Sequence, residues 1–187
     1  DVVTFYRYVL DQGVDPRNIF ISGDSAGGAV AIALLRYIEE TKVLPSTRGV
    51  MLWSPWLDVS SSAVSRYSKS KSLRTDFLNL GLIEWGKSAF QPVPRSEEQE
   101  RYLCPAAHAF RSQTPVFVNA GTAEILHEEI TEFVRNMDQV DGNKMCYVET
   151  KDAPHDVLCD GSVWKLGPPV RPVHVTHVIH TVYSSIE

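Results

Sequence analysis

The chain has 187 residues, 43% of them hydrophobic and 22% charged, which excludes global intrinsic disorder and suffices for a domain with a buried core. Its formal net charge of −5, from 23 Asp and Glu against 18 Lys and Arg, argues against nucleic acid or an anionic membrane as a partner. The longest apolar run, residues 29–35, is too short to cross a bilayer, so we expect no stable membrane anchor.

The first part of the chain predicts helix, strand, helix and strand in alternation, which is typical of a parallel α/β sheet. The first helix has five apolar residues on one face and is expected to end at Gly13. These residues are Val2, Phe5, Tyr6, Val9 and Leu10. A strand follows at residues 18–22, and an amphipathic helix then runs from Ala26 to a point before Pro45. A second strand is predicted at residues 49–53.

The second part of the chain predicts two more strands, at residues 115–119 and 144–149, joined by an amphipathic helix. The stripe of that helix is formed by Ile130, Phe133, Val134 and Met137. Residues 60–112 are polar and rich in Ser and Pro, and hold only short helical patches such as residues 80–90. We therefore expect a mostly parallel sheet of about four strands flanked by helices, with a partly irregular excursion over the mouth of the sheet between the second and third strands.

A metal or disulfide site is not expected. The three cysteines have no C-x-x-C spacing and are predicted to be ordinary thiols: Cys104, Cys146 and Cys159. The three tail histidines, spaced three apart, match neither face of a strand, and no Cys or carboxylate joins them: His174, His177 and His180. The residues do not identify a compartment, although the cytoplasm is slightly favoured.

The strongest chemical signal is the hexapeptide Gly23-Asp24-Ser25-Ala26-Gly27-Gly28, which directly follows a predicted strand and opens a predicted helix. G-x-S-x-G in that position is the nucleophile elbow, a turn so tight that glycines must flank the serine. Ser25 is the predicted nucleophile. The backbone N–H of Ala26, at the helix N-terminus, is expected to point at a developing oxyanion.

An elbow serine needs a general base and an acid that orients it, and on this scaffold they follow in the order Ser, Asp or Glu, His. Glu124 comes just after the third predicted strand and is the expected acid. His155 comes just after the fourth and is the expected base. Each is unremarkable alone, and the three positions together make the prediction. Glu128 and Glu129 are weaker candidates for the acid, since both are expected to cap and charge a helix start.

These motifs together resemble hormone-sensitive-lipase-like esterases of the α/β-hydrolase fold. The resemblance rests on the elbow, on residues 54–58 (S-P-W-L-D) and on residues 123–129 (A-E-I-L-H-E-E). It extends to Cys104-Pro105 and to His155-Asp156-Val157. It implies hydrolysis of small acyl esters, of short to medium chain length, with Ser25 acylated and no cofactor. Most members have Asp at the acid position, where this chain has Glu124.

The resemblance covers residues 1–158, and two departures from the family pattern set further expectations. Family members carry an H-G-G-G-type segment upstream of the elbow, and the only Gly-Gly pair in this chain, Gly27-Gly28, belongs to the elbow itself. We therefore expect residues 1–159 to be the C-terminal half of an α/β-hydrolase catalytic domain, and residues 160–187 an atypical tail. Weak or absent turnover is expected for the chain alone, together with self-association through an exposed, apolar sheet edge.

Several residues are candidates for the substrate pocket, and the sequence leaves two alternatives to a serine esterase open. Asp24 and Trp56 are the predicted substrate-binding residues, while Asp58, Asp76 and Phe77 are expected to line or cover the site, with a structural role equally plausible. The alternatives to a serine esterase are an amidase or peptidase of the same fold and a non-catalytic interaction module.

Overall fold

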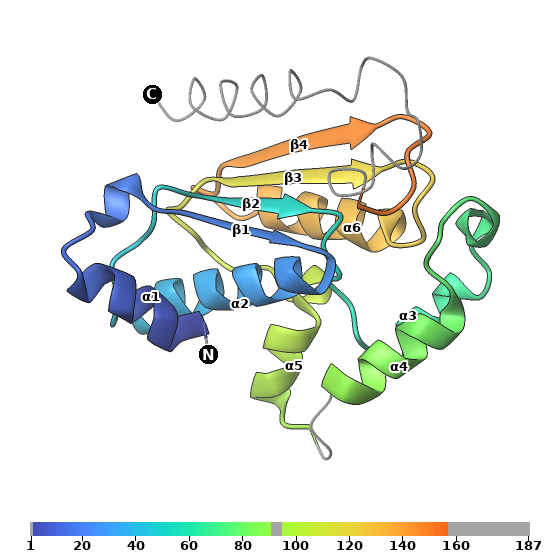
Figure 1. The fold of residues 1–187 in the computed structure, drawn as a ribbon, viewed down its shortest axis with the longest axis horizontal. Helices are drawn as coiled ribbons and strands as arrows, with labels where there is room; N and C mark the ends of the chain where they lie inside the picture. Colours follow the sequence, from blue (N-terminus) through green and yellow to red (C-terminus); the bar gives the residue numbers. More distant parts are fainter. Residues whose placement is uncertain (1, 91–94, 157–187) are drawn as a thin grey trace.

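The computed structural model describes residues 2–90 and 95–156, in which four strands form one sheet in the order β1-β2-β3-β4. The strands are β1 (Phe20–Asp24), β2 (Gly49–Trp53), β3 (Val116–Gly121) and β4 (Met145–Thr150). All neighbours are parallel, so the four arrows in Figure 1 point the same way. The predicted α/β architecture with a four-stranded parallel sheet is confirmed.

The first strand begins later than predicted because of a local turn. Pro16–Asn18 form a 3-10 turn, and the Asp15 side chain accepts a hydrogen bond from the Arg17 backbone N–H at its start. Proline fixes φ near the value that this turn needs and lacks the N–H that a strand would use. The chain becomes extended only after this turn, so β1 starts at Phe20 rather than at residue 18.

Successive side chains of the central strands point to opposite faces of the sheet. Val50, Leu52, Val116 and Val118 join the main core, which includes residues of the helices. Trp53 and Phe117 form a cluster of their own, with ring centroids 5.2 Å apart. Both faces of β2 and β3 are therefore apolar, as expected of strands in the middle of a parallel sheet.

Three helices pack with the sheet on one side: α1 (Val2–Asp11), α2 (Ser25–Thr41) and α6 (His127–Asp138). The α2 helix contacts β1 and β2, α6 contacts β3 and β4, and α1 packs on α2 (Figure 1). The predicted apolar face of α1 is wrong at Phe5, which is 65% exposed. Tyr6 is the buried residue of α1, and its hydroxyl donates to the carbonyl of Pro45.

The excursion between β2 and β3 is more helical than its composition suggests. It contains α3 (Ser61–Tyr67), α4 (Leu80–Phe90) and α5 (Glu97–Leu103), and the predicted patch at 80–90 is confirmed as α4. A capping box between Ser96 and Gln99 starts α5, a signal that the sequence analysis missed. Figure 1 shows α3 and α4 beyond the end of the sheet at which the strand arrows terminate. No helix in the described parts of the chain is long and apolar enough to span a membrane.

Candidate active site

The elbow joins the end of β1 to the start of α2 without an intervening loop. Ser25 has φ 49°, a left-handed backbone conformation that costs about 1–3 kcal/mol in a non-glycine residue. A Cβ atom on Gly23 would lie 2.3 Å from the carbonyl oxygen of Gly27, and one on Gly28 would lie 2.6 Å from the Pro55 side chain. Only glycine fits at either position, and the strained turn holds Ser25 at the carboxyl edge of the sheet.

Ser25, His155 and Glu124 form a continuous hydrogen-bonded series. Nε2 of His155 is 2.8 Å from Oγ of Ser25, and Nδ1 of His155 is 3.0 Å from Oε2 of Glu124. Glu124 and His155 are 1% and 2% exposed, so their contact is shielded from water. With the imidazole proton on Nδ1 and donated to Glu124, Nε2 can accept the proton of the Ser25 hydroxyl.

The loops that carry Glu124 and His155 hold each other through backbone contacts. The N–H of Gly121, at the end of β3, donates to Oε1 of Glu124 at 2.9 Å. The N–H of Ala123 donates to the carbonyl of Ala153, also at 2.9 Å. A Cβ atom on Gly121 would lie 2.3 Å from that same carbonyl oxygen, so this approach needs glycine.

The segment after β2 also takes part in the site, and Ser54 is the residue there to which the sequence analysis gave no role. Ser54 has φ 42°, and its hydroxyl accepts a hydrogen bond from the N–H of Asp156. Two residues later, the N–H of Trp56 donates to the carbonyl of Ser25 at 2.9 Å. The Ser-Pro dipeptide directly after a strand was the available signal, because it marks a forced turn at the carboxyl edge of the sheet.

An apolar cavity of about 230 Å³ lies next to Ser25 and Ala26. Its other lining residues, besides Trp56, are Leu78, Leu82, Ile83, Trp85, Gly86 and Leu126. Most of them belong to α4 and the residues before it, so the excursion supplies one wall of the cavity. The structure thus places Trp56 in the cavity wall. Asp24 is exposed and is not among the lining residues, so no contact supports a substrate-binding role for it.

Three other predicted pocket residues are absent from the cavity lining. Asp76 and Phe77 contact the loops of Glu124 and His155 instead. Asp58 accepts hydrogen bonds from the Ser60 N–H and from Arg66. Burial disfavours the ionised form of Asp58, but these hydrogen bonds outweigh burial and the pKa of Asp58 is lowered.

The expectation that Glu129 caps a helix start is wrong, because its side chain is fully buried. Its Oε1 accepts the N–H of Leu57 at 2.8 Å, and its Oε2 accepts the hydroxyl of Tyr67 and lies 3.4 Å from Arg66. Burial raises the pKa of Glu129 to about 8, against the opposing effect of these hydrogen bonds. Glu129 therefore joins α6, α3 and the segment after β2, and it makes no contact with His155 among the hydrogen bonds of this site.

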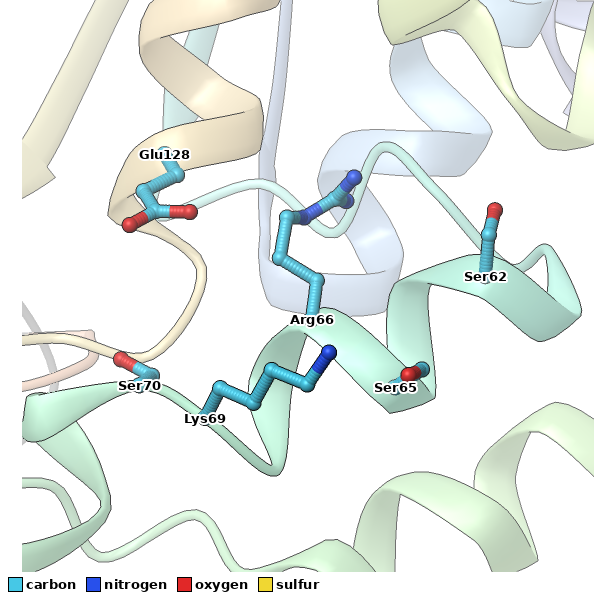
Figure 2. A pocket seen from close by; sticks show the side chains of 6 residues that line it. All are labelled: Ser62, Ser65, Arg66, Lys69, Ser70 and Glu128. Atoms are coloured by element: carbon cyan, nitrogen blue, oxygen red, sulfur yellow. The ribbon is translucent and has the colours of Figure 1, made fainter.

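Glu128 points elsewhere. Figure 2 shows it at the start of α6, across a polar hollow from Arg66 and Lys69 of the α3 region. The hollow has a volume of about 370 Å³, and Ser62, Ser65 and Ser70 complete its lining. Glu128 and Ser25 thus line different cavities, which makes Glu128 a suitable control residue.

The histidines of the tail lie outside the described residues, as does Cys159. Within residues 2–90 and 95–156, no group of three His, Cys, Asp or Glu side chains could hold a metal ion. Cys104 and Cys146 are free thiols.

The chain is similar in sequence to known proteins. A family model described as the alpha/beta hydrolase fold matches residues 1–159. An esterase of Acinetobacter venetianus is 31% identical over 141 residues, which are 73% of this chain and 44% of that protein. An acetyl-hydrolase of Streptomyces hygroscopicus is 25% identical over 130 residues, which are 69% of this chain and 42% of that protein.

Solved structures share the fold. The crystal structure of an esterase from the bacterial hormone-sensitive lipase family has a TM-score of 0.79 at 21% identity, over 100% of this chain and 60% of that one. The chain spans less than half the length of the esterase and acetyl-hydrolase that it matches.

Proposed function

The chain belongs to the α/β-hydrolase fold family, as its resemblance to hormone-sensitive-lipase-like esterases predicted, and we propose that the protein hydrolyses carboxylic esters through an acyl-enzyme on Ser25. The observation that carries this proposal is the series Ser25–His155–Glu124, with contacts of 2.8 and 3.0 Å. The proposed roles are nucleophile, general base and orienting acid.

In the acylation step, Oγ of Ser25 bonds to the ester carbonyl carbon while its proton passes to Nε2 of His155. The carbonyl electron pair moves to oxygen and gives a tetrahedral oxyanion. Collapse of this species restores the C=O bond and breaks the C–O bond to the alcohol, which leaves with the proton from Nε2. The carboxylate of Glu124 stabilises the imidazolium that forms between these transfers.

In the deacylation step, water attacks the acyl carbon and gives its proton to Nε2 of His155. The second tetrahedral species collapses with cleavage of the bond to Oγ, and Ser25 takes the proton back as the carboxylic acid leaves. The only reactants that the two steps consume are the ester and one water molecule.

The oxyanion needs hydrogen-bond donors, and the proposed first donor is the N–H of Ala26. Ala26 lies in the first turn of α2, where backbone N–H groups have no partner within the helix and the helix dipole favours negative charge. Each such donor contributes about 2.7–4 kcal/mol to stabilising the transition state. Family members take further donors from an upstream glycine-rich segment, and the 187 residues contain no such segment. The expectation of weak turnover for this chain alone stays a prediction.

The proposed substrates are esters with a small apolar acyl or alcohol group. The cavity beside Ser25 measures about 230 Å³ and is lined mainly by apolar side chains, which is small compared with pockets for drug-sized ligands of about 300–1,000 Å³. The name of the similar acetyl-hydrolase of Streptomyces hygroscopicus agrees with a short acyl group. Small aliphatic esters are therefore expected to be preferred over long-chain ones.

Self-association is a second part of the proposal. Among the described strands β1 pairs with β2 alone, so its other edge is the proposed surface for pairing with a strand of a second copy. Sedimentation velocity over a concentration series tests this proposal. A dimer is the expected result, and a monomer at all concentrations would contradict it.

The division into a partial catalytic domain at 1–159 and a distinct tail at 160–187 likewise stays a proposal.

The experiment for the main proposal is hydrolysis of p-nitrophenyl butyrate, measured for the 187-residue chain and for a longer form with an upstream glycine-rich segment if the gene encodes one. Turnover by the longer form, lost in Ser25→Ala, is the expected result. Robust turnover by the 187-residue chain would overturn only the expectation of weak activity. Amide but not ester turnover would favour an amidase or peptidase, and no turnover of either would favour a non-catalytic module.

A further inference from the structure

Residues 75–77 of the excursion contact both loops that carry the acid and the base. The Thr75 hydroxyl lies 2.9 Å from the carbonyl oxygen of Ala123, directly before Glu124. Oδ2 of Asp76 accepts the N–H of Ile125, directly after Glu124, at 2.7 Å. The same tripeptide therefore holds the backbone on both sides of the acid.

The same carboxylate also reaches the base. Oδ1 of Asp76 accepts the N–H of His155 at 3.3 Å. Next to it, the ring of Phe77 packs against the imidazole of His155 in an edge-on arrangement, with centroids 5.6 Å apart. The carboxylate of Asp76 is half-buried, and it lies 49 positions from Ile125 and 79 positions from His155 along the chain. It thus joins the loop after β3 to the loop after β4.

A third contact extends this connection to the cavity. Oδ1 of Asp76 also accepts the N–H of Leu78 at 3.2 Å, and Leu78 lines the cavity beside Ser25. The side chain of Asp76 therefore fixes the acid loop, the base loop and the start of the cavity wall relative to one another.

The chemistry of these contacts requires a carboxylate. All three donors are backbone N–H groups, and they approach both oxygens of the side chain, so each oxygen must accept. An asparagine at this position has one accepting oxygen and one NH₂ group. Whichever way it is turned, its NH₂ faces at least one N–H and leaves that donor without a partner.

We propose that Asp76 is a positioning residue, which sets the alignment of His155 between Glu124 and Ser25 and couples that alignment to the cavity wall. This inference rests on the proposed function and adds to it a residue that touches none of the reacting atoms. Misplacement of a catalytic group by about 1 Å can lower the rate about 100-fold, so contacts of this kind matter for turnover.

The test compares Asp76→Asn with wild type in a form of the protein that hydrolyses p-nitrophenyl butyrate, with Asp141→Asn as the matched surface control. We expect kcat per folded molecule to fall on the order of 10- to 100-fold and KM to rise by a smaller factor than kcat falls, because the chemistry depends on the alignment of His155 while Leu78 is the one cavity residue whose backbone Asp76 holds. The fraction folded is taken from circular dichroism. Wild-type kcat in a folded Asp76→Asn variant would overturn the proposal.

A second readout does not depend on turnover. The proton on Nδ1 of His155 is expected to give a downfield NMR signal in wild type and Asp141→Asn, and to exchange faster with water in Asp76→Asn. An unchanged signal contradicts the proposal. If wild type hydrolyses no ester, the proposed function fails, and this signal still decides the role of Asp76.

A second variant tests the neighbouring contact of Thr75. Thr75→Val removes the contact to Ala123 and leaves the carboxylate in place, so we expect a smaller loss of kcat, about threefold to tenfold, with KM unchanged. If Asp76→Asn does not fold, Asp76→Glu decides, because it keeps the charge but carries the accepting oxygens on a longer side chain; a loss of kcat is expected, and wild-type kcat in folded Asp76→Glu then overturns the proposal.

Discussion

Oγ of Ser25 lies 2.8 Å from Nε2 of His155, although 130 positions separate the two residues in the chain. Ser25 directly follows β1, and His155 comes five residues after the end of β4, at the opposite edge of the sheet. Parallel strands bring their carboxyl ends to one side of a sheet, where the loops that follow them can meet. The loops after β3 and β4 close the remaining distance through the contact of Ala123 with Ala153.

The elbow gives a test of stability with a built-in control. Gly23→Ala places a Cβ atom 2.3 Å from a backbone oxygen and is expected to lower the free energy of unfolding by about 1–3 kcal/mol. Gly27→Ala has only the Asp24 side chain nearby, at 3.8 Å, and sits in a helix, so it is expected to be neutral or to stabilise by up to about 1 kcal/mol. Urea unfolding of both variants checks this, and equal stabilities would contradict the elbow geometry.

The identity of the acid is tested by two isosteric changes. Glu124→Gln puts an amide beside Nδ1 of His155 and is expected to lower kcat on the order of 10³- to 10⁴-fold, because the imidazole is no longer held in the working tautomer. Glu128→Gln alters the separate polar hollow of Figure 2 and should leave kcat within about twofold of wild type. If Glu128→Gln is the damaging change, the assignment of the acid is wrong.

The sequence predicted much of this site because its signals are local. The elbow needs glycine at positions 23 and 28, although position 27 has room for a Cβ atom against the expectation from the motif. Glu124 and His155 each follow an apolar strand that periodicity reveals. The fold followed from the same strands, with errors at strand ends, at the exposed Phe5 of α1 and in the excursion, which is more helical than expected. The Pro16 turn shows why ends are hard to predict, since it displaced the start of β1 by two residues.

The parts that could not be predicted depend on contacts between distant segments. Asp76 was expected to line or cover the site, but nothing in the local sequence indicates that its carboxylate accepts hydrogen bonds from Ile125 and His155. Glu129 lies in the first turn of α6, where a carboxylate normally faces solvent, and only the packing of Tyr67 and Leu57 against it shows that it is buried.

The size of the cavity is tested at Gly86. A Cβ atom there would lie 3.2 Å from the ring of Trp56, so Gly86→Ala narrows the space beside Ser25. We expect the ratio of kcat/KM for p-nitrophenyl octanoate to that for the acetate to fall about tenfold. Gly81→Ala, on the same helix but away from the cavity lining, should leave the ratio unchanged. Equal ratios in the two variants would exclude this cavity as the acyl site.

The buried Glu129 predicts an unusual dependence of stability on pH. Its pKa is raised by burial to about 8 in the folded chain, against a usual value of 4.5, so between these values the folded state holds a proton that the unfolded state has lost. The stabilisation that protonated Glu129 gives the folded state is therefore complete below about pH 4.5 and is lost as the pH rises through 8. Free energies of unfolding are measured by urea titration at pH 5, 6.5 and 8. They should decline less with rising pH in Glu129→Gln than in wild type. An identical slope in wild type and variant would contradict the burial of an ionisable carboxyl at this position.

Covalent labelling with a fluorophosphonate probe tests most directly whether Ser25 is a nucleophile activated by His155. The modified peptide is then identified by mass spectrometry. Such a probe reacts with an activated serine and needs no completed turnover. We expect a single adduct on Ser25, absent from Ser25→Ala and formed much more slowly in His155→Ala. An adduct on another residue, or labelling of Ser25 at the same rate without His155, would contradict it.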